Sequence, residues 1–332
     1  MARYHVYGLG NALVDTEFSV TDDFLEQEKI QKGVMTLVDE EAQRVLFERL
    51  SQRFGIKKRA GGGSAANTIY AISQFGGSTY YSCKVADDEP GDFYLQELGS
   101  HNIHTNLGSG RDHGTTGKCL VMVSPDTERT MLTFLGISEK LDSSAIDAEA
   151  LRDSQFLYME GYLVTSPTGR QAVIDARKIA EANGVKTALT LSDPAMVQFF
   201  RGGLEEMIGD GVDLLFANET EAMTWAGTRS VEDAIPALQK IAKVLVLTLG
   251  PDGALVVDGD ERTPIEPVKV QAIDTNGAGD MFAGAFLYGL TTGHDYATSG
   301  KLAALAAATT VSHFGPRLSP AQHQEIRKAV LG

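Results

Sequence analysis

The residues best suited to chemistry lie in the stretch 274–284, where a glycine-rich turn precedes an apolar pattern with helical spacing. Gly277, Ala278 and Gly279 leave their backbone N–H groups uncovered at the expected start of the helix, and such a terminus attracts phosphate. Asp280 follows directly. A carboxylate would repel a phosphate that merely bound there, but it could accept the proton of a substrate hydroxyl. The stretch therefore predicts phosphoryl transfer to a hydroxyl group.

A different interpretation of this stretch is a hairpin turn at Asn276-Gly277, with Asp280 as an ordinary helix cap. A hairpin requires a second strand with alternating polar and apolar residues. The residues after Asp280 instead repeat with helical spacing, namely Met281, Phe282, Ala285, Phe286 and Leu290. The pattern favours the helix and, with it, the phosphate site.

The second half of the chain is typical of a parallel sheet with crossover helices, because short apolar runs alternate with helical patterns. The runs are Phe156–Met159, Val185–Leu191, Asp213–Phe216, Val244–Leu249 and Leu255–Val257. Ligands of such sheets bind at the carboxyl ends of the strands. This rule selects Asp193, Asn218 and Thr248–Gly250.

Asn218-x-x-Glu221 has the spacing of a helix capping box. Capping is compatible with function, since a carboxylate at a strand end could hold Mg²⁺ through water and an amide could reach nucleotide phosphates. The turn Thr248-Leu-Gly250-Pro-Asp-Gly253 ends the next strand. It is equally well explained as a tight loop.

The first half of the chain is more mixed. Strands are expected at Tyr4–Leu9 and Tyr80–Val85, and helices at Asp39–Leu50, Asn67–Gln74 and Gly91–Leu98. Three further strands without flanking helices predict a small β-sheet lid: one at Gly33–Val38, and a hairpin formed by Lys118–Val123 and Arg129–Phe134. A mobile lid could bring Arg129 over a phosphate during transfer.

A second glycine cluster, 60–67, formally matches a dinucleotide fingerprint, but the preceding residues are too basic and broken for a buried strand. The cluster can instead let the backbone approach a polyhydroxylated ligand at Gly62 and Gly63. Asn67 would offer that ligand a donor and an acceptor. Asn11 and Asp15 form a similar set for a diol, although both are also common turn residues.

Length and composition narrow the class of protein. A chain of 332 residues can form one large α/β domain. A net charge of −15 argues against nucleic acid or an anionic membrane as the main partner. Two cysteines cannot form a disulfide framework, and the N-terminus lacks a signal peptide's apolar segment, so we expect a cytoplasmic protein.

Together these motifs resemble those of the ribokinase-like (PfkB) carbohydrate and nucleoside kinases, across nearly the whole chain. The matching motifs are Gly62-Gly63-x-x-x-Asn67, Asn218-x-x-Glu221, Thr248-x-Gly250 and Asp274-Thr-Asn-Gly-Ala-Gly-Asp280. Within that family, Gly10-Asn11-x-x-x-Asp15 and the last motif look most like those of adenosine kinases, including bacterial ones. The resemblance implies a three-layer α/β/α ribokinase-like fold in one domain, residues 1–332, with a lid from roughly 11–38 and 114–136.

The resemblance also assigns roles to residues. Asp280 would be the catalytic base, and Gly277, Ala278 and Gly279 would form the anion hole. The acceptor would be held by Asn11, Asp15, Gly62, Gly63 and Asn67, and covered by the lid residues Met122 and Phe134. ATP would be bound by Asn218, Glu221, Thr248, Gly250 and Gly253. Glu221 would organise Mg²⁺, and Asp274 stands where the family often builds a monovalent-cation site, which would hold K⁺.

The implied reaction is ATP-dependent phosphorylation of the 5′-hydroxyl of a purine nucleoside, with adenosine favoured as the acceptor. Alternatives within the family are a ribose or fructose kinase and an inosine or guanosine kinase. A nucleoside-binding sensor would gain nothing from Asp280, and a dehydrogenase rests only on the weak glycine fingerprint. The resemblance leaves open whether the protein is a monomer or a lid-mediated homodimer.

Overall fold

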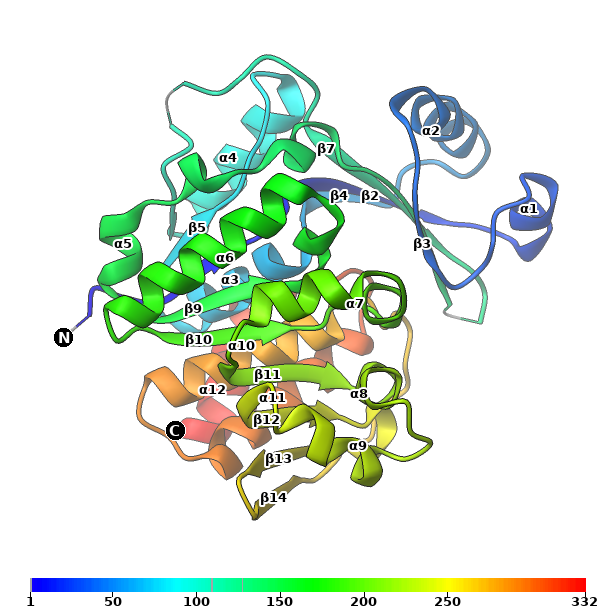
Figure 1. Cartoon of the computed structure of the whole chain (residues 1–332). Coiled ribbons are helices and arrows are strands. Elements are labelled where there is room, and N and C mark those ends of the chain that lie inside the picture. Colours follow the sequence, from blue (N-terminus) through cyan, green and yellow to red (C-terminus); the bar gives the residue numbers. More distant parts are fainter. Residues whose placement is uncertain (1, 109, 127) are drawn as a thin grey trace.

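The computed structural model describes residues 2–108, 110–126 and 128–332, and its largest element is a twisted sheet (Figure 1). From one edge to the other this sheet contains β14 (Glu261–Ile265), β13 (Ala254–Asp258), β12 (Ala242–Thr248), β11 (Val212–Asn218), β10 (Lys186–Thr190), β9 (Ser154–Glu160), β1 (Tyr4–Leu9), β5 (Thr79–Ser82) and β6 (Ile103–His104). Strands β12 to β6 are parallel. Their carboxyl ends therefore meet along one edge, where the strand-end rule expects a ligand.

The expectation that Leu255–Val257 continues the parallel sheet was wrong. This run lies in β13, which is antiparallel to β12 and pairs in turn with β14. The physical reason is the short connection after Thr248. A parallel crossover needs a dozen or more residues, whereas a tight turn can only return the chain in the opposite direction.

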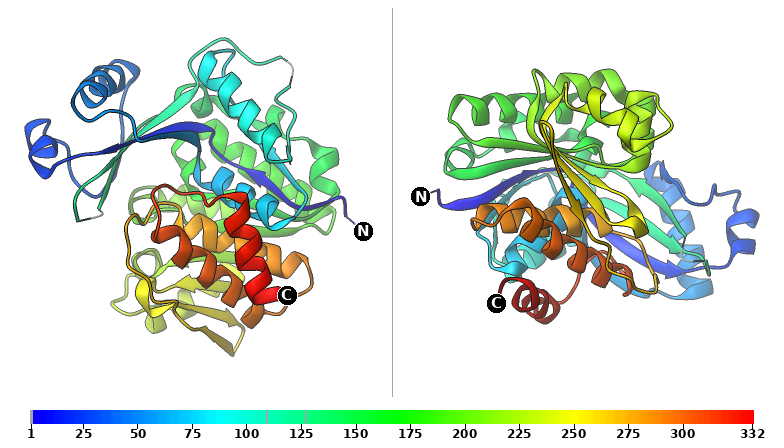
Figure 2. Two further views of the ribbon diagram at one scale, coloured as in Figure 1. Left: turned by 180° about the vertical axis from the view of Figure 1, so that it is seen from behind. Right: turned by 90° about the horizontal axis from the view of Figure 1, so that it is seen from below.

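Helices cover both faces of the larger sheet, as the view from below shows (Figure 2). One face is covered by α3 (Ser64–Phe75), α4 (Glu89–Ser100), α10 (Ala278–Thr291), α11 (Tyr296–Val311) and α12 (Pro320–Leu331). The other face is covered by α5 (Ala148–Arg152), α6 (Pro167–Ala182), α7 (Pro194–Ile208), α8 (Glu219–Ala226) and α9 (Val231–Leu238). Short 3₁₀ turns occupy Gly136–Lys140, Ser143–Ala145, Gly161–Thr165 and Gly250–Asp252. The three-layer α/β/α prediction is confirmed.

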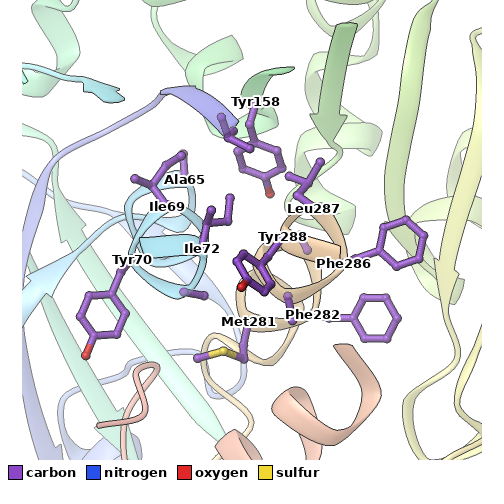
Figure 3. Packing of buried hydrophobic residues seen from close by; sticks show 14 of the residues in the cluster. Ala65, Ile69, Tyr70, Ile72, Tyr158, Met281, Phe282, Phe286, Leu287 and Tyr288 are labelled. Carbon is purple, nitrogen blue, oxygen red and sulfur yellow. The ribbon is translucent and has the colours of Figure 1, made fainter. Parts of the chain in front are cut away.

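Packing between α3 and α10 fixes the geometry of the central residues of the site. Apolar side chains from both helices interdigitate, among them Ile69 and Ile72 of α3 and Leu287 of α10 (Figure 3). A Cβ at Gly284 would approach the carbonyl oxygen of Thr68 to 2.7 Å, so glycine lets the two helices come close. The first turns of α3 and α10 are thereby brought together, and their polar residues can meet.

The lid is a second sheet that projects from the body together with two helices (Figure 1). Its strand order is β3 (Met35–Leu37), β8 (Arg129–Phe134), β7 (Gly117–Val123), β2 (Leu13–Ser19) and β4 (Lys58–Gly62), and its helices are α1 (Asp22–Gln27) and α2 (Glu40–Phe54). The lid has a hydrophobic core of its own, which includes Phe18, Phe24, Leu46, Leu50, Leu120 and Met122. The predicted β7–β8 hairpin is confirmed.

The lid extends beyond the expected ranges 11–38 and 114–136, because β4 pairs in its sheet and α2 packs in its core. Two strands of this sheet also differ from what the sequence predicted. β2 follows β1 after only three residues, so Asp15 lies within a strand instead of a strand-end turn. β4 forms an edge of the lid sheet, where basic residues such as Lys58 and a glycine pair are tolerated.

Candidate active site

A cavity of about 450 Å³ lies between the lid and the carboxyl edge of the larger sheet. Its walls come from strand ends of the body, from the inner face of the lid and from residues 275–279, here called the anion loop. Asp193, Asn218 and Thr248 all line it, whereas Leu249 and Gly250, which the strand-end rule also selected, do not. The volume is typical of a small-molecule site.

The anion loop leads into α10 with its backbone exposed to the cavity. Gly277 has a φ of 68°, a left-handed conformation that glycine adopts without strain, and a Cβ there would overlap Pro316. Among the residues that the structure describes, no side chain caps this helix. The position beside Gly279 is open. The first N–H groups of α10 are thus available to an anion.

Asp280 points from the first turn of α10 toward α3. Its Oδ1 accepts a hydrogen bond from Ser64 Oγ (2.7 Å) and its Oδ2 accepts one from Asn67 Nδ2 (3.0 Å). Burial raises the pKa of Asp280 to about 6, while the bonds from Ser64 and Asn67 lower it. The carboxylate is therefore mostly ionised at neutral pH, and burial makes it a stronger base than an exposed aspartate.

Glu160 is a buried carboxylate at the end of β9 that the sequence reasoning missed. Its Oε1 accepts hydrogen bonds from the backbone N–H (2.7 Å) and the side-chain amide (2.8 Å) of Asn11, and its Oε2 accepts one from the N–H of Ala65 (2.7 Å). Burial raises the pKa of Glu160 to about 7. The strand-end rule could have selected this residue, because it directly follows the apolar run 156–159.

Asp15 projects from β2 into the cavity, next to the glycine pair at the end of β4. A Cβ at Gly62 would overlap the Asp15 carboxylate, and one at Gly63 would overlap the carbonyl oxygen of Asn11. Burial, with a smaller contribution from Glu17, raises the pKa of Asp15 to about 7. The glycine pair thus permits close packing against protein atoms, and its approach to a ligand stays a prediction.

Arg317 is a second residue that the sequence reasoning missed. Its Nε donates to Asn67 Oδ1 (2.9 Å), and its guanidinium lies 4.7 Å from the ring centroid of Tyr70. Because Asn67 then has its carbonyl oxygen engaged, its amide nitrogen is turned toward Asp280. Arg317 therefore orients Asn67, and its positive charge also lowers the pKa of Asp280.

The opposite side of the cavity is formed by Asn218 and Glu221 at the start of α8. The predicted capping box is confirmed: Glu221 N–H donates to Asn218 Oδ1 (2.8 Å), and Asn218 N–H donates to Glu221 Oε2 (3.0 Å). Burial raises the pKa of Glu221 to about 7, with further contributions from Asp193 and Asp280. The negative charges of Asp193 and Asp280 therefore act on Glu221.

Arg129 extends from β8 to the base of the anion loop. Its Nε lies 2.7 Å from Oδ1 of Asp274, which is fully buried. Asp274 Oδ1 also accepts from the N–H of Asn276 (2.9 Å), and its Oδ2 accepts from the N–H of Gly315 (2.7 Å). The lid and the anion loop are therefore joined through a buried ion pair.

A comparison with protein families decides what kind of protein carries this arrangement. Residues 33–323 match the family described as "pfkB family carbohydrate kinase". The chain belongs to the pfkB family of carbohydrate kinases. It is accordingly a phosphotransferase that acts on an alcohol group.

Individual relatives of this pfkB kinase span almost its whole length. Adenosine kinase from Saccharomyces cerevisiae is 28% identical, covering 93% of this chain and 95% of the relative, and ribokinase from Staphylococcus aureus is 28% identical, covering 92% and 95%. Among solved structures, adenosine kinase from Sinorhizobium meliloti superposes with a TM-score of 0.93 at 34% identity, covering 99% and 100%. A probable sugar kinase from Rhizobium etli superposes with a TM-score of 0.93 at 32% sequence identity, and the superposition covers 99% of each chain.

Most residues predicted for the site of this pfkB kinase line the cavity. They are Asn11, Asp15, Gly63, Asn67, Arg129, Asn218, Glu221, Thr248, Gly277, Ala278, Gly279 and Asp280. The cavity lining does not include Gly62, Gly250, Gly253 or Asp274. Gly62 and Asp274 lie behind lining residues, and Gly253, with a φ of 91°, serves the turn before β13.

The expectation that Met122 and Phe134 face the cavity was wrong. Side chains of a strand alternate between two faces, and the cavity face carries Cys119 of β7 and Met131 of β8. Met122 has the opposite parity and is fully buried in the lid's own core. Phe134 has the same parity as Leu132, which packs against that core. Alternation gives two faces but does not say which one meets the ligand.

In the described ranges no group of three or more histidine, cysteine, aspartate or glutamate residues could hold a metal ion. No helix of the described chain is long and apolar enough to cross a membrane.

Proposed function

We propose that this pfkB kinase transfers the γ-phosphoryl group of ATP to the 5′-hydroxyl of adenosine, producing AMP. The observation that carries the proposal is the position of Asp280. Its carboxylate stands at the exposed start of α10, between a diol-binding set on α3 and β2 and a polar set at the ends of β11 and β12. A base placed between two such sets can accept the hydroxyl proton as phosphoryl transfer proceeds.

The acceptor half of the cavity suits a ribose. Asp15 can accept hydrogen bonds from two hydroxyl groups, and Asn11 and Asn67 can supply an amide on either side. Glu160 and Arg317 hold these two amides in place. Because the orienting residues are themselves buried or hydrogen-bonded, the acceptor's hydroxyl would meet Asp280 with little reorganisation.

The donor half of the cavity suits a nucleotide triphosphate with Mg²⁺. The exposed N–H groups of the anion loop would receive the γ-phosphate, with Asn218 and Thr248 nearer the remaining phosphates. Mg²⁺ bound to those phosphates would neutralise their charge. The carboxylates of Glu221 and Asp193 fit such an ion through water, because Mg²⁺ prefers oxygen ligands and usually arrives with phosphates and several waters.

The lid supports a nucleoside over a free sugar. Its cavity face is mostly apolar and includes Leu13, Met35, Leu37, Met131 and Leu135. Leu37 is 46% exposed. A purine base would cover this apolar surface, which a free sugar would leave against water. Ribose or fructose, inosine and guanosine remain the alternative acceptors, and closure of the lid would exclude water from the transfer step.

The acceptor can be identified by measuring ADP release with MgATP and each candidate in turn. We expect kcat/KM for adenosine to exceed that for ribose and fructose by at least about 10²-fold, because the apolar contacts of the base contribute only in the nucleoside. A comparison of inosine and guanosine with adenosine tests whether the enzyme recognises the polar groups of the purine base. A higher kcat/KM for a free sugar would overturn the nucleoside assignment and leave the kinase reaction in place.

The pH dependence of kcat tests the role of Asp280. The carboxylate must be ionised to accept a proton, and burial gives it a pKa of about 6. We therefore expect kcat to be level above neutral pH and to fall by about tenfold per pH unit below the pKa. In Ser64→Ala, the loss of a bond that lowers the pKa should move this fall to higher pH. An unchanged kcat down to pH 5 would contradict the role.

A further inference from the structure

Four charged side chains lie together where the lid meets the base of the anion loop: Arg129, Asp274, Glu17 and Lys58. We call them the buried charge cluster, of which Lys58 is the partly buried member. Asp274 and Glu17 are 0% and 1% exposed, and Arg129 is 7% exposed. Lys58 and Glu17 both lie beside Gly315, where a Cβ would meet Lys58 Nζ at 2.7 Å and Glu17 Oε1 at 3.0 Å. The proposed phosphoryl-transfer mechanism assigns no part to this cluster.

The charges of the buried charge cluster balance only if Arg129 is present. Within the described part of the chain, neither carboxylate oxygen of Glu17 has a hydrogen-bond partner, so its charge depends on nearby cations. Burial raises the pKa of Glu17 and Asp274 raises it further, whereas Lys58 and Arg129 lower it and so favour its ionised form. Without Arg129, two buried carboxylates would share the single charge of Lys58, an unfavourable arrangement in a poorly solvated site.

The residues around Asp274 do not fit the monovalent cation that resemblance to the family implies. K⁺ is held by several oxygens that replace its hydration shell. Both oxygens of Asp274 already accept backbone N–H groups, and Oδ1 faces the guanidinium of Arg129. The nearby carbonyl oxygen of Val311 accepts the N–H groups of both Ile273 (2.7 Å) and Asp274 (3.1 Å). A cation here would also meet the positive charge of Arg129.

We propose that Arg129 replaces the monovalent cation, so that this enzyme needs no K⁺ or Na⁺ for activity. The proposal rests on the proposed kinase function for its activity readout. The guanidinium neutralises Asp274, and Asp274 in turn holds the N–H groups of Asn276 and Gly315, which shape the anion loop. Arg129 is therefore a positioning residue for the anion hole. Because it stands on β8, the lid itself carries the required charge.

The wild-type enzyme gives the first test. ADP release is measured in KCl, NaCl and tetramethylammonium chloride at equal ionic strength, with ATP supplied free of alkali metal. The tetramethylammonium ion is too large to enter a buried site. We expect kcat to agree within about twofold in the three salts. Binding of an activating cation would typically change activity by about fivefold or more. A stimulation by K⁺ of about fivefold or more would overturn the proposal.

Arg129→Met gives the second test, because it removes the charge and keeps apolar bulk. We expect at least about tenfold lower kcat in tetramethylammonium chloride, and a recovery of about fivefold or more in KCl, as the vacated site admits a cation. An equal loss in all three salts would overturn the proposal, since Arg129 would then act on the phosphate or on folding. Arg111→Met, which breaks a pair with Asp92 outside the cluster, should show no dependence on the salt.

Thermal unfolding separates this proposal from the proposed function, because it requires no turnover. KCl should raise the melting temperature of Arg129→Met relative to tetramethylammonium chloride and leave that of wild type unchanged. If Arg129→Met does not fold, the double variant Arg129→Met with Asp274→Asn should fold, because the uncompensated charge is gone. Failure of the double variant to fold, or an equal response of wild type to KCl, would overturn the proposal even if adenosine is the acceptor.

Discussion

Asp280→Asn is expected to lower kcat by at least about 10²-fold, the lower end of the range for acid–base groups. Asparagine has nearly the same shape but cannot accept a proton at neutral pH. It would also place an amide donor toward Ser64 Oγ or Asn67 Nδ2, where the carboxylate now accepts both bonds. The measurement is ADP release under saturating adenosine and MgATP.

Folding and nucleotide binding separate this loss of catalysis from a general defect. The melting temperature of Asp280→Asn should stay near that of wild type, and calorimetry should still detect MgATP binding, because the anion loop and the capping box at α8 are untouched. Asp210→Asn, at an exposed position, is the matched control and should retain full activity. Turnover by Asp280→Asn near the wild-type rate would show that another group accepts the proton.

Glu160→Gln is expected to lower kcat/KM for the acceptor by roughly 10- to 100-fold, because one of the buried donors would lose its acceptor, which costs about 1–3 kcal/mol. Glu160 accepts three N–H groups, two from Asn11 and one from Ala65. A glutamine amide must turn its own NH₂ toward one of them. The assay is run at pH 8, above the pKa of about 7 that burial gives Glu160.

The affinity for MgATP distinguishes positioning of the acceptor from loss of the fold. Glu160→Gln should bind MgATP as wild type does, since its contacts all lie on the acceptor side of the cavity. Glu149→Gln, an exposed substitution on α5, serves as the matched control. An unchanged kcat/KM for adenosine would mean that Asn11 does not need the Glu160 carboxylate, and a weakened affinity for MgATP would point to a wider disturbance.

The parts of the site that could be predicted from sequence are those encoded by local patterns. The anion loop and Asp280 are adjacent in the chain and are followed by a clear helical repeat. Asn218 and Glu221 form a helix cap whose spacing is visible in one turn. The strand-end rule then placed these segments at one edge of the sheet, which the register of β11 and β12 confirms by pairing Asn218 with Thr248.

The parts that could not be predicted depend on contacts between distant segments. Arg317 and Asn67 are 250 positions apart, and no sequence pattern indicates that they are in contact. Glu160 could in principle have been predicted, because it ends a buried strand. A single acidic residue after an apolar run is nevertheless a weak local signal. The pairing of Arg129 with Asp274 required the lid to be placed over the body, and no periodicity supplies that orientation.

The division of the lid sheet into two faces separates the requirements of stability from those of recognition. One face packs Phe18, Leu120 and Met122 into a core that holds the lid together. The other face offers Leu37 and Met131 to the cavity. Substitutions at Leu37, which is exposed to the cavity, can therefore change its lining while the core of the opposite face stays intact.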